Sequence, residues 1–255
     1  EVLQLESVAC KDWLTNKVDR SVTGKIAMQQ CAGPLQLPLN NLGAVALDFQ
    51  GEKGIATSIG HAPVSALVDS ANGSRLSIAE SLTNLVWAPI EQGIKGVSLS
   101  ANWMWPCKNK GEDARLYKAV ESISEFAIEL GLNVPTGKDS LSMTQKYGQD
   151  DVVYAPGTVI ISTVGEIIDI NRMVSPVLKN VANSHLLHID FSKDAFQLGG
   201  SSFAQIVNKL GKITPNVNDA KYFAKTFETL QQLILDSKIL AGHDISSGGM
   251  VTALL

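Results

Sequence analysis

The sequence predicts an α/β (α+β) fold, in which a mixed sheet is packed by two main helices and is followed by a truncated α/β segment. Apolar runs rich in Val, Ile and Ala, which are typical of buried strands, alternate with two segments whose apolar residues recur at helical spacing. A proline and several polar residues interrupt this pattern at 174–183. We therefore expect an N-terminal domain over residues 1–174, a linker over 175–183 and the beginning of a second domain over 184–255.

The composition favours a globular protein and argues against several classes of partner. Apolar residues make up 45% of the 255-residue chain, which is enough for a sizeable core. The 21 basic residues are outnumbered by 25 acidic ones and form no cluster, so neither nucleic acid nor an anionic membrane is expected as the main partner. The sequence contains no signal-peptide pattern and no run of about 18 apolar residues. We expect a cytoplasmic protein.

The first elements are short and are separated by proline and glycine. Residues 19–31 are predicted to form a loop leading to a helix, and residues 31–38 a connector with two prolines. Residues 42–49 are apolar and partly alternating, which predicts a buried strand. After a glycine turn, residues 55–59 are expected to continue the sheet.

Two helices dominate the middle of the chain. In the first, residues 73–84, the apolar residues Ile78 and Leu82, with Leu85 and Val86 beyond them, form one stripe that can face a sheet. Residues 70–73 contain the small polar side chains that often precede a helix. The second helix is predicted over 112–130 and ends at Gly131.

Further strands and helices follow these two. We expect strands at 94–101, 152–164, 185–191 and 239–245, and helices that begin near residues 201, 219 and 248. The second domain would then hold two strands and two full helices, and the sequence ends inside a third helix. These few elements cannot build a core of ordinary depth. We therefore expect this chain to be a piece of a longer polypeptide.

Three groups of polar residues can carry chemistry. Glu80 and Asn84 lie four residues apart on the polar face of the first helix, where two oxygen ligands for a hard cation would point the same way. The segment TGKDS at 136–140 is predicted to be a glycine turn, but it lacks the pattern of a P-loop. The segment HDISSGG at 243–249 places Asp244 between a strand end and a helix start. Solvated surface, ordinary loop chemistry and helix capping explain the same three patterns.

The cysteines and two of the four histidines do not indicate a site. Cys10, Cys31 and Cys107 are far apart and form no CxxC pattern, so we expect reduced thiols. His185 and His188 lie three residues apart in a predicted strand, which puts them on opposite faces and argues against a shared metal.

Nine segments occur together in an order that resembles one family. They are DRSVTGKIAMQQC, GPLQLPL, ATSIGHAPV, GSRLSIAESLTN, LSANWMWP, GEDARLYKAV, PTGKDSLSM, SPVL and AGHDISSGG. Together they resemble the large, single-chain phosphoribosylformylglycinamidine synthases, which are glutamine amidotransferases of purine biosynthesis. That family contains two fused units similar to aminoimidazole ribonucleotide synthetase, followed by a glutaminase domain. The chain is similar to the second unit, which implies a synthetase-like N-terminal domain followed by the opening part of its C-terminal domain.

The resemblance implies an activity, ligands and partners. The family is a ligase that uses ATP to activate the formyl amide oxygen of formylglycinamide ribonucleotide, after which ammonia derived from glutamine displaces the phosphate. Its second unit holds ADP with Mg2+ in a site that is not catalytic. The remaining domains of the same polypeptide are the expected partners, and the separated piece is expected to be inactive.

The resemblance also implies site residues. Glu80, Asn84, Asp244 and Asn41 correspond to metal ligands, although the family's residue at position 41 is an aspartate, whose carboxylate attracts Mg2+ more than an amide does. Asn40 and Ser246 would contact the nucleotide. Gly137 would approach the nucleotide of the catalytic site in the other unit. Lys138 and Ser140 would act there as catalytic residues that contact the phosphate region of the substrate.

Two other kinds of protein stay open on the sequence alone. One is another ATP-dependent synthetase of the same superfamily, such as a selenophosphate or aminoimidazole ribonucleotide synthetase. The other is a non-catalytic module that binds nucleotide or dimerises. Because a sheet face intended for the first unit would be exposed, we expect this piece to form a homodimer.

Overall fold

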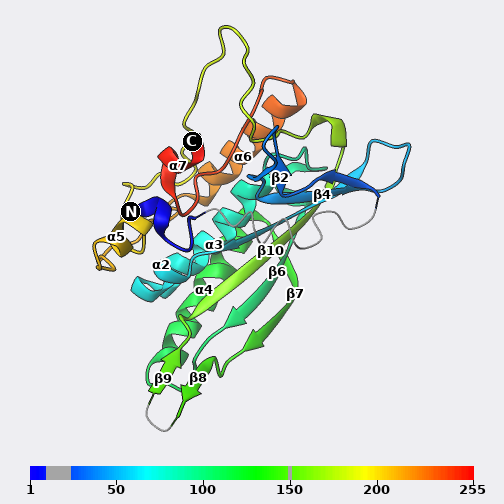
Figure 1. Ribbon diagram of the computed structural model, residues 1–255. Coiled ribbons are helices and arrows are strands. Elements are labelled where there is room, and N and C mark those ends of the chain that lie inside the picture. Colours follow the sequence, from blue (N-terminus) through cyan, green and yellow to red (C-terminus); the bar gives the residue numbers. More distant parts are fainter. Residues whose placement is uncertain (10–23, 149–150) are drawn as a thin grey trace.

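A computed structural model of the protein describes residues 1–9, 24–148 and 151–255, and its largest element is a six-stranded mixed sheet with the order β1-β4-β5-β10-β6-β7 (Figure 1). Neighbouring strands are antiparallel except β6 and β7, which are parallel. The strands of this sheet are β1 (Ile26–Met28), β4 (Leu42–Ala46), β5 (Gly54–His61), β6 (Val97–Met104), β7 (Asn133–Ser140) and β10 (Thr158–Ile167). Two small hairpins accompany it, β2 (Cys31–Ala32) with β3 (Leu37–Pro38) and β8 (Thr144–Tyr147) with β9 (Asp151–Tyr154).

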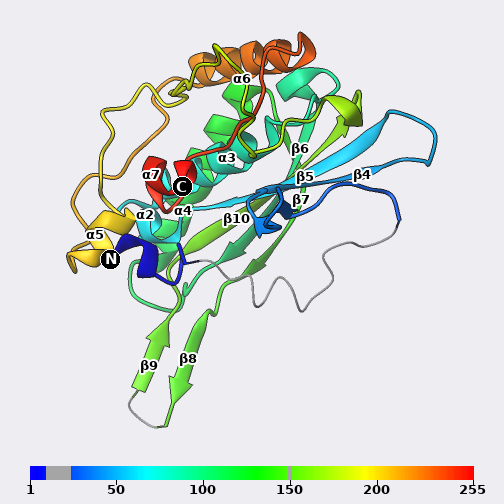
Figure 2. The ribbon, with the colours of Figure 1, turned by 45° about the horizontal axis from the view of Figure 1, so that its top comes forward.

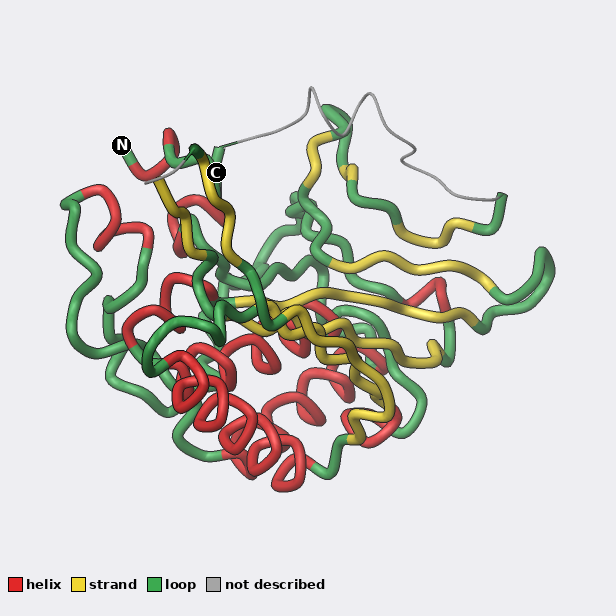
Figure 3. Tube along the Cα trace, turned by 90° about the horizontal axis from the view of Figure 1, so that it is seen from below, coloured by secondary structure: helices red, strands yellow, loops and turns green. Residues whose placement is uncertain are grey.

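Helices cover one face of the sheet and leave the other open (Figure 3). The three long helices are α3 (Ser70–Leu85), α4 (Glu112–Leu130) and α6 (Ala220–Leu235), and the shorter ones are α2 (Pro63–Val68), α5 (Ser202–Ile206) and α7 (Gly249–Leu254). Single 3-10 turns lie at η1 (Val2–Gln4), η2 (Gly93–Gly96) and η3 (Ile170–Arg172). The prediction of a mixed sheet with two main packing helices is confirmed, since α3 and α4 lie against it (Figure 2). Among the described residues, no helix has the length and apolar character needed to span a membrane.

The core lies between the sheet and the helices. The predicted stripe on α3 is confirmed, because Ile78, Leu82, Leu85 and Val86 are fully buried. Alternation along β5 sends Ala56, Ser58 and Gly60 to the helix side and the residues between them to the open side. Helix α6 joins the same core through Phe223, Phe227 and Leu230.

The first and last residues of the two main helices agree closely with the bounds predicted from the sequence. Helix α4 has the predicted bounds, and Gly131 ends it with a φ of 73°, a backbone conformation that glycine adopts without strain. Asp69 caps α3 by accepting a hydrogen bond from the Asn72 N–H, so the helix begins three residues earlier than the predicted segment.

Several predicted strands and turns were wrong. Residues 26–28 form a strand instead of a helix, because β4 provides hydrogen-bond partners for them; the part of that prediction at 19–23 lies outside the described residues. The TGKDS segment is not a turn but lies in β7, paired with β6. The single strand predicted at 152–164 is two strands, because Pro156 has no N–H for a ladder and Gly157 packs closely against the Trp105 ring.

Two predicted strands near the C-terminus are also absent from the described residues. Residues 185–191 and 239–245 are irregular, and no described strand lies beside either one to complete a ladder. His185 and His188 are therefore exposed loop residues. Cys31 and Cys107 are free thiols, as expected, and Cys10 lies outside the described residues.

A buried glutamine fastens α6 to the segment that follows α3. The Gln231 side chain is 4% exposed; its Oε1 accepts from the Ile90 N–H at 2.7 Å, and its Nε2 donates to the carbonyl oxygens of Val86 and Ala88 at 2.6 and 2.9 Å. All three backbone groups are buried, so they have little access to water as a substitute. This contact sets the position of α6, and with it the start of the chain that leads to Asp244.

We predict that Gln231→Ala destabilises the protein by about 2–4 kcal/mol, because buried polar groups lose their partners and a small cavity forms. Urea unfolding followed by circular dichroism measures the change. Gln232→Ala, one residue further along on the exposed side of α6, is the matched control and is expected to change the free energy of unfolding by less than about 1 kcal/mol. Equal effects of the two substitutions would contradict the role given to Gln231.

Candidate functional site

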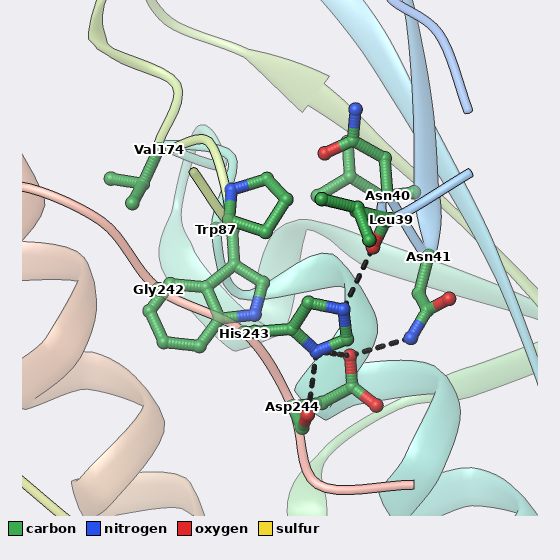
Figure 4. Close-up of a pocket in the computed structure, with 10 residues that line it drawn as sticks. Leu39, Asn40, Asn41, Trp87, Val174, Gly242, His243 and Asp244 are labelled. Carbon is green, nitrogen blue, oxygen red and sulfur yellow. Dashed lines mark hydrogen bonds and ion pairs between the residues drawn. The ribbon is translucent and has the colours of Figure 1, made fainter. Parts of the chain in front are cut away.

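Three segments that are distant in the sequence meet beside the end of α3. They are the loop 39–41 before β4, the helix residues Glu80 and Asn84, and the segment 242–244 after α6. The Asn41 Nδ2 donates to Asp244 Oδ1 at 2.7 Å, across 203 positions in the sequence. Figure 4 shows Asn41 and His243 on either side of Asp244, with the carbonyl of Leu39 beyond the His243 ring.

One of the two predicted ligands on α3 is buried, and the other is partly buried. Asn84 is 4% exposed, and its Nδ2 donates to the Ile59 carbonyl at 2.9 Å, which leaves its Oδ1 buried without a hydrogen-bond partner. Glu80 accepts from the His61 N–H at 3.0 Å through Oε2. Surface exposure, the simplest explanation of this Glu and Asn pair, is therefore wrong for Asn84.

Asp244 provides a second buried oxygen atom that is available as a ligand. It is 8% exposed, and its Oδ2, like the Asn84 Oδ1, is buried without a hydrogen-bond partner. Buried oxygen atoms of this kind are stabilised by a donor or a cation. No three His, Cys, Asp or Glu side chains in the described ranges are arranged to hold a metal ion, so a cation here would need the amide oxygens as well as the carboxylates.

The electrostatics of the cluster reflect its burial. Burial raises the pKa of Glu80 to about 7, the His61 N–H partly opposes this, and the nearby charge of Asp244 adds to the increase. Burial lowers the pKa of His243, but the hydrogen bond and charge of Asp244 outweigh that effect and raise it to about 9. Glu80 and Asp244 therefore place two carboxyl groups close together in a buried site, and the imidazole of His243 lies beside Asp244.

The donor set fits a hard divalent cation. Carboxylate and amide oxygens are the protein ligands that Mg2+ accepts, usually together with phosphate oxygens. Asn41 does not present an oxygen atom to a cation in this conformation, because its amide N–H, not its oxygen, faces Asp244. Asn40 is fixed next to it, with its Nδ2 donating to the Gln29 carbonyl and its N–H to the Gln30 carbonyl. Ser246 is exposed, two residues beyond Asp244.

The other predicted site residues lie at the opposite edge of the sheet. Gly137, Lys138 and Ser140 are in β7, and the Lys138 Nζ donates to Ser140 Oγ at 2.8 Å. Gly137 is required there, because a Cβ would lie 2.3 Å from the Ala101 carbonyl oxygen. Four strand spacings separate β7 from β4, roughly 19 Å, so the two groups do not form one site in this chain.

Two hollows adjoin the cluster. A small cavity of about 10 Å3 lies between the loop before β4 and the segment 242–244, and it is lined by Leu39, Asn40, Asn41, Leu42, Trp87, Val174, Pro176, Gly242, His243 and Asp244. A larger one of about 600 Å3 lies on the open sheet face and shares Asn40, Asn41 and Leu42; Thr57, Ser98, Ser100, Thr136 and Ser162 are among the residues that line it. His243 and Trp87 were not predicted as site residues, although the position of His243 beside Asp244 was the available signal.

We predict that stability falls as the pH rises through the range set by Glu80. A carboxyl group whose folded pKa is about 7 and whose unfolded pKa is 4.5 binds more protons when folded, so the free energy of unfolding decreases between these values. The slope is at most about 1.4 kcal/mol per pH unit. His243 acts the same way over a higher range, up to about pH 9.

Urea unfolding from pH 4.5 to 7 measures this decrease, and Glu80→Gln is expected to remove it. Glu121→Gln, at an exposed position of α4, is the control that should leave the profile unchanged. An identical pH profile for the wild type and Glu80→Gln would show that Glu80 is ionised normally.

Comparisons with known proteins agree with this architecture. Residues 10–166 match the family model described as FGAR-AT PurM_N-like domain. The whole chain is 43% identical over 255 residues to phosphoribosylformylglycinamidine synthase of Homo sapiens and 42% identical over 265 residues to the probable enzyme of Caenorhabditis elegans. It spans about a fifth of these relatives, 19% and 20% of their lengths.

Solved structures show the same fold at low sequence identity. PurL of Thermotoga maritima complexed with FGAR superimposes with a TM-score of 0.54 and 14% identity, covering 84% of this chain and 32% of that one. PurLQS from the same organism gives a TM-score of 0.50 and 15% identity, covering 66% and 25%. At these identities the likeness concerns the fold alone.

Proposed function

The chain belongs to the FGAR-AT PurM_N-like domain family, and from that premise we propose that it forms the second synthetase-like unit of a phosphoribosylformylglycinamidine synthase and holds ADP with Mg2+. The observation that carries this proposal is the pair of buried oxygens without partners, Asn84 Oδ1 and Asp244 Oδ2, beside the carboxyl group of Glu80. The relatives of high identity are about five times as long, so the activity of the whole protein is part of the proposal.

Each residue would have a limited task at this site. Asp244, Glu80 and Asn84 would offer oxygen atoms to the cation, and Asn41 would join them once its amide turns its oxygen inward. Asn40 and Ser246 would contact the nucleotide. When bound, Mg2+ would neutralise the charge of the diphosphate. We infer that the site holds its nucleotide without chemical change, since all the groups named here are ligands.

The edge of the sheet at β7 would serve the reaction itself. The parent enzyme would activate the formyl amide oxygen of formylglycinamide ribonucleotide with ATP and accept ammonia from glutamine. Lys138 and Ser140 would contact the phosphate region of that substrate, where an ammonium and a hydroxyl group can both donate hydrogen bonds. Gly137 would allow close approach to the nucleotide of the catalytic site. These roles place the catalytic contribution of this chain in a site completed by other domains.

We further infer the division of the chain into a synthetase-like domain over 1–174, a linker over 175–183 and the beginning of the C-terminal domain over 184–255. The open face of the sheet would then pair with the first unit. Exposed apolar side chains on three adjacent strands, Val45, Ile59 and Val164, support a partner on this face. Without that unit, a second copy of the chain would occupy it.

We predict that the chain binds ADP with a Kd of about 1 μM or lower when Mg2+ is present, equivalent to about −8 kcal/mol, and at least tenfold more weakly without it. Calorimetric titration measures both values. Asn84→Leu, which removes a ligand and keeps the volume, should reduce the Mg2+-dependent part of the affinity. Asn41→Asp should increase that part, because a carboxylate binds the cation more strongly than an amide.

Glu121→Gln is again the matched control and should bind as the wild type does. If the wild type and Asn41→Asp both fail to bind ADP with Mg2+, the proposed site does not exist in this chain. Binding that is independent of Mg2+ in every variant would indicate a nucleotide site that uses none of these oxygens.

We predict that the chain is a homodimer at micromolar concentration. Light scattering should give twice the mass of a single chain for the wild type. Val164→Lys, in the middle of the open face, should give a monomer, because it buries a charge in the interface. Val153→Lys, on the projecting hairpin, is the matched control and should remain dimeric. A monomeric wild type would contradict the use of this face by a second copy.

A further inference from the structure

The ring of His243 joins two segments that lie on different sides of the candidate site. Its Nε2 lies 2.7 Å from the carbonyl oxygen of Leu39, which is 204 positions away in the sequence, and its Nδ1 lies 2.6 Å from the carbonyl oxygen of Asp244. Carbonyl oxygens only accept hydrogen bonds, so both ring nitrogens act as donors. The imidazole therefore forms a bridge of fixed length between the two backbones (Figure 4).

The segment that carries His243 has little freedom to move. The Gly242 N–H donates to the Ser175 carbonyl at 3.1 Å. A Cβ on Gly242 would lie 2.0 Å from the Trp87 ring, which shows how closely this backbone packs on the indole. Residues 242–244 are thus fixed against the body of the domain, and the bridge transmits that position to Leu39.

The loop 39–41 is where the bridge has its effect. Asn40 is held from one side by the carbonyls of Gln29 and Gln30. From the other side, the loop is held by His243 at Leu39 and by the hydrogen bond from Asn41 to Asp244. In the proposed site the amide of Asn41 turns its oxygen toward the cation, which breaks its hydrogen bond to Asp244 Oδ1. The His243 bridge uses neither the Asn41 side chain nor Asp244 Oδ2, so it stays in place as the link between this loop and the segment 242–244.

We propose that His243 is a positioning residue, which holds the loop 39–41 at the separation from Asp244 that a divalent cation and the diphosphate of a nucleotide require. This inference rests on the proposed function of the site. Partners in the outer shell of a metal site commonly change its affinity 10- to 100-fold, because they fix the ligands without touching the metal. His243 would act in this way on Asn41 and Asp244 together.

Two substitutions separate the bridge from other effects of the ring. A glutamine at this position can extend an N–H to the Leu39 carbonyl, as the imidazole Nε2 does, whereas an asparagine is too short. We expect His243→Asn to increase amide hydrogen exchange at residues 40–42 about tenfold or more in the protein without ligand, and His243→Gln to restore slow exchange. Exchange within α3 is the internal reference, and His185→Asn, at an exposed loop position, is the control.

Titration of the same proteins with ADP and Mg2+ gives the second readout. His243→Asn should bind about 10- to 100-fold more weakly, and His243→Gln should recover most of the loss. Unchanged exchange at 40–42 in His243→Asn, or equal affinity in His243→Asn and the wild type, would overturn the positioning role. A wild type that does not bind ADP with Mg2+ would overturn the proposed function, and the positioning role for that ligand with it; the exchange data would then still show whether the bridge holds the loop.

Discussion

The buried carboxylate of Asp244 is the constraint on which the candidate site depends. A buried anion is tolerated only when hydrogen bonds or opposite charge compensate its lost hydration. At 8% exposure, Asp244 obtains this compensation from Asn41 on one side and from the adjacent His243 on the other. Both partners therefore have to be present before the segment 242–244 can occupy this position. The requirement brings the loop before β4 and the chain after α6 together, although neither contains a regular element at the contact.

The position of Asp244 also depends on packing at a distance. Helix α6 lies in the same core as α3 and α4, with Phe223 in edge contact with Phe126. Gln231 fixes the helix lengthwise, because its amide matches three backbone groups at 86–90. The chain after α6 then returns over Trp87 to reach the end of α3. The segment 242–244 is consequently positioned by apolar burial and by one buried amide, whereas Glu80 and Asn84 are held by hydrogen bonds to β5.

Local sequence signals predicted the helices well and the irregular segments poorly. The bounds of α4 follow from apolar spacing and from Gly131, which act within a few residues of each end. Strands depend on partners elsewhere in the chain, so the apolar run at 239–245 looked like a strand without being one. The same reason applies to TGKDS, whose glycine suggested a turn but allows close contact with Ala101 in a paired strand.

Site residues show a similar division between local and distant causes. The spacing of Glu80 and Asn84 was visible in the sequence, because helix geometry places them on one face. That Asn84 is buried beneath Ile59 could not be known without the packing of β5 on α3. His243 was missed because its task is defined by the carbonyl of Leu39, and backbone groups carry no signature in a sequence.

The asparagine at position 41 gives the cluster its particular balance of charge. Burial is the main cause of the raised pKa of Glu80, and the charge of Asp244 adds a smaller repulsion to it. An aspartate at position 41 would add a third carboxyl group and increase that repulsion, whereas Asn41 instead donates a hydrogen bond to Asp244. The protein is thereby stabilised in the absence of a cation. The same bond has to break before Asn41 can become a ligand. The hydrogen bond that stabilises the site without a cation therefore lowers the affinity of the site for a cation.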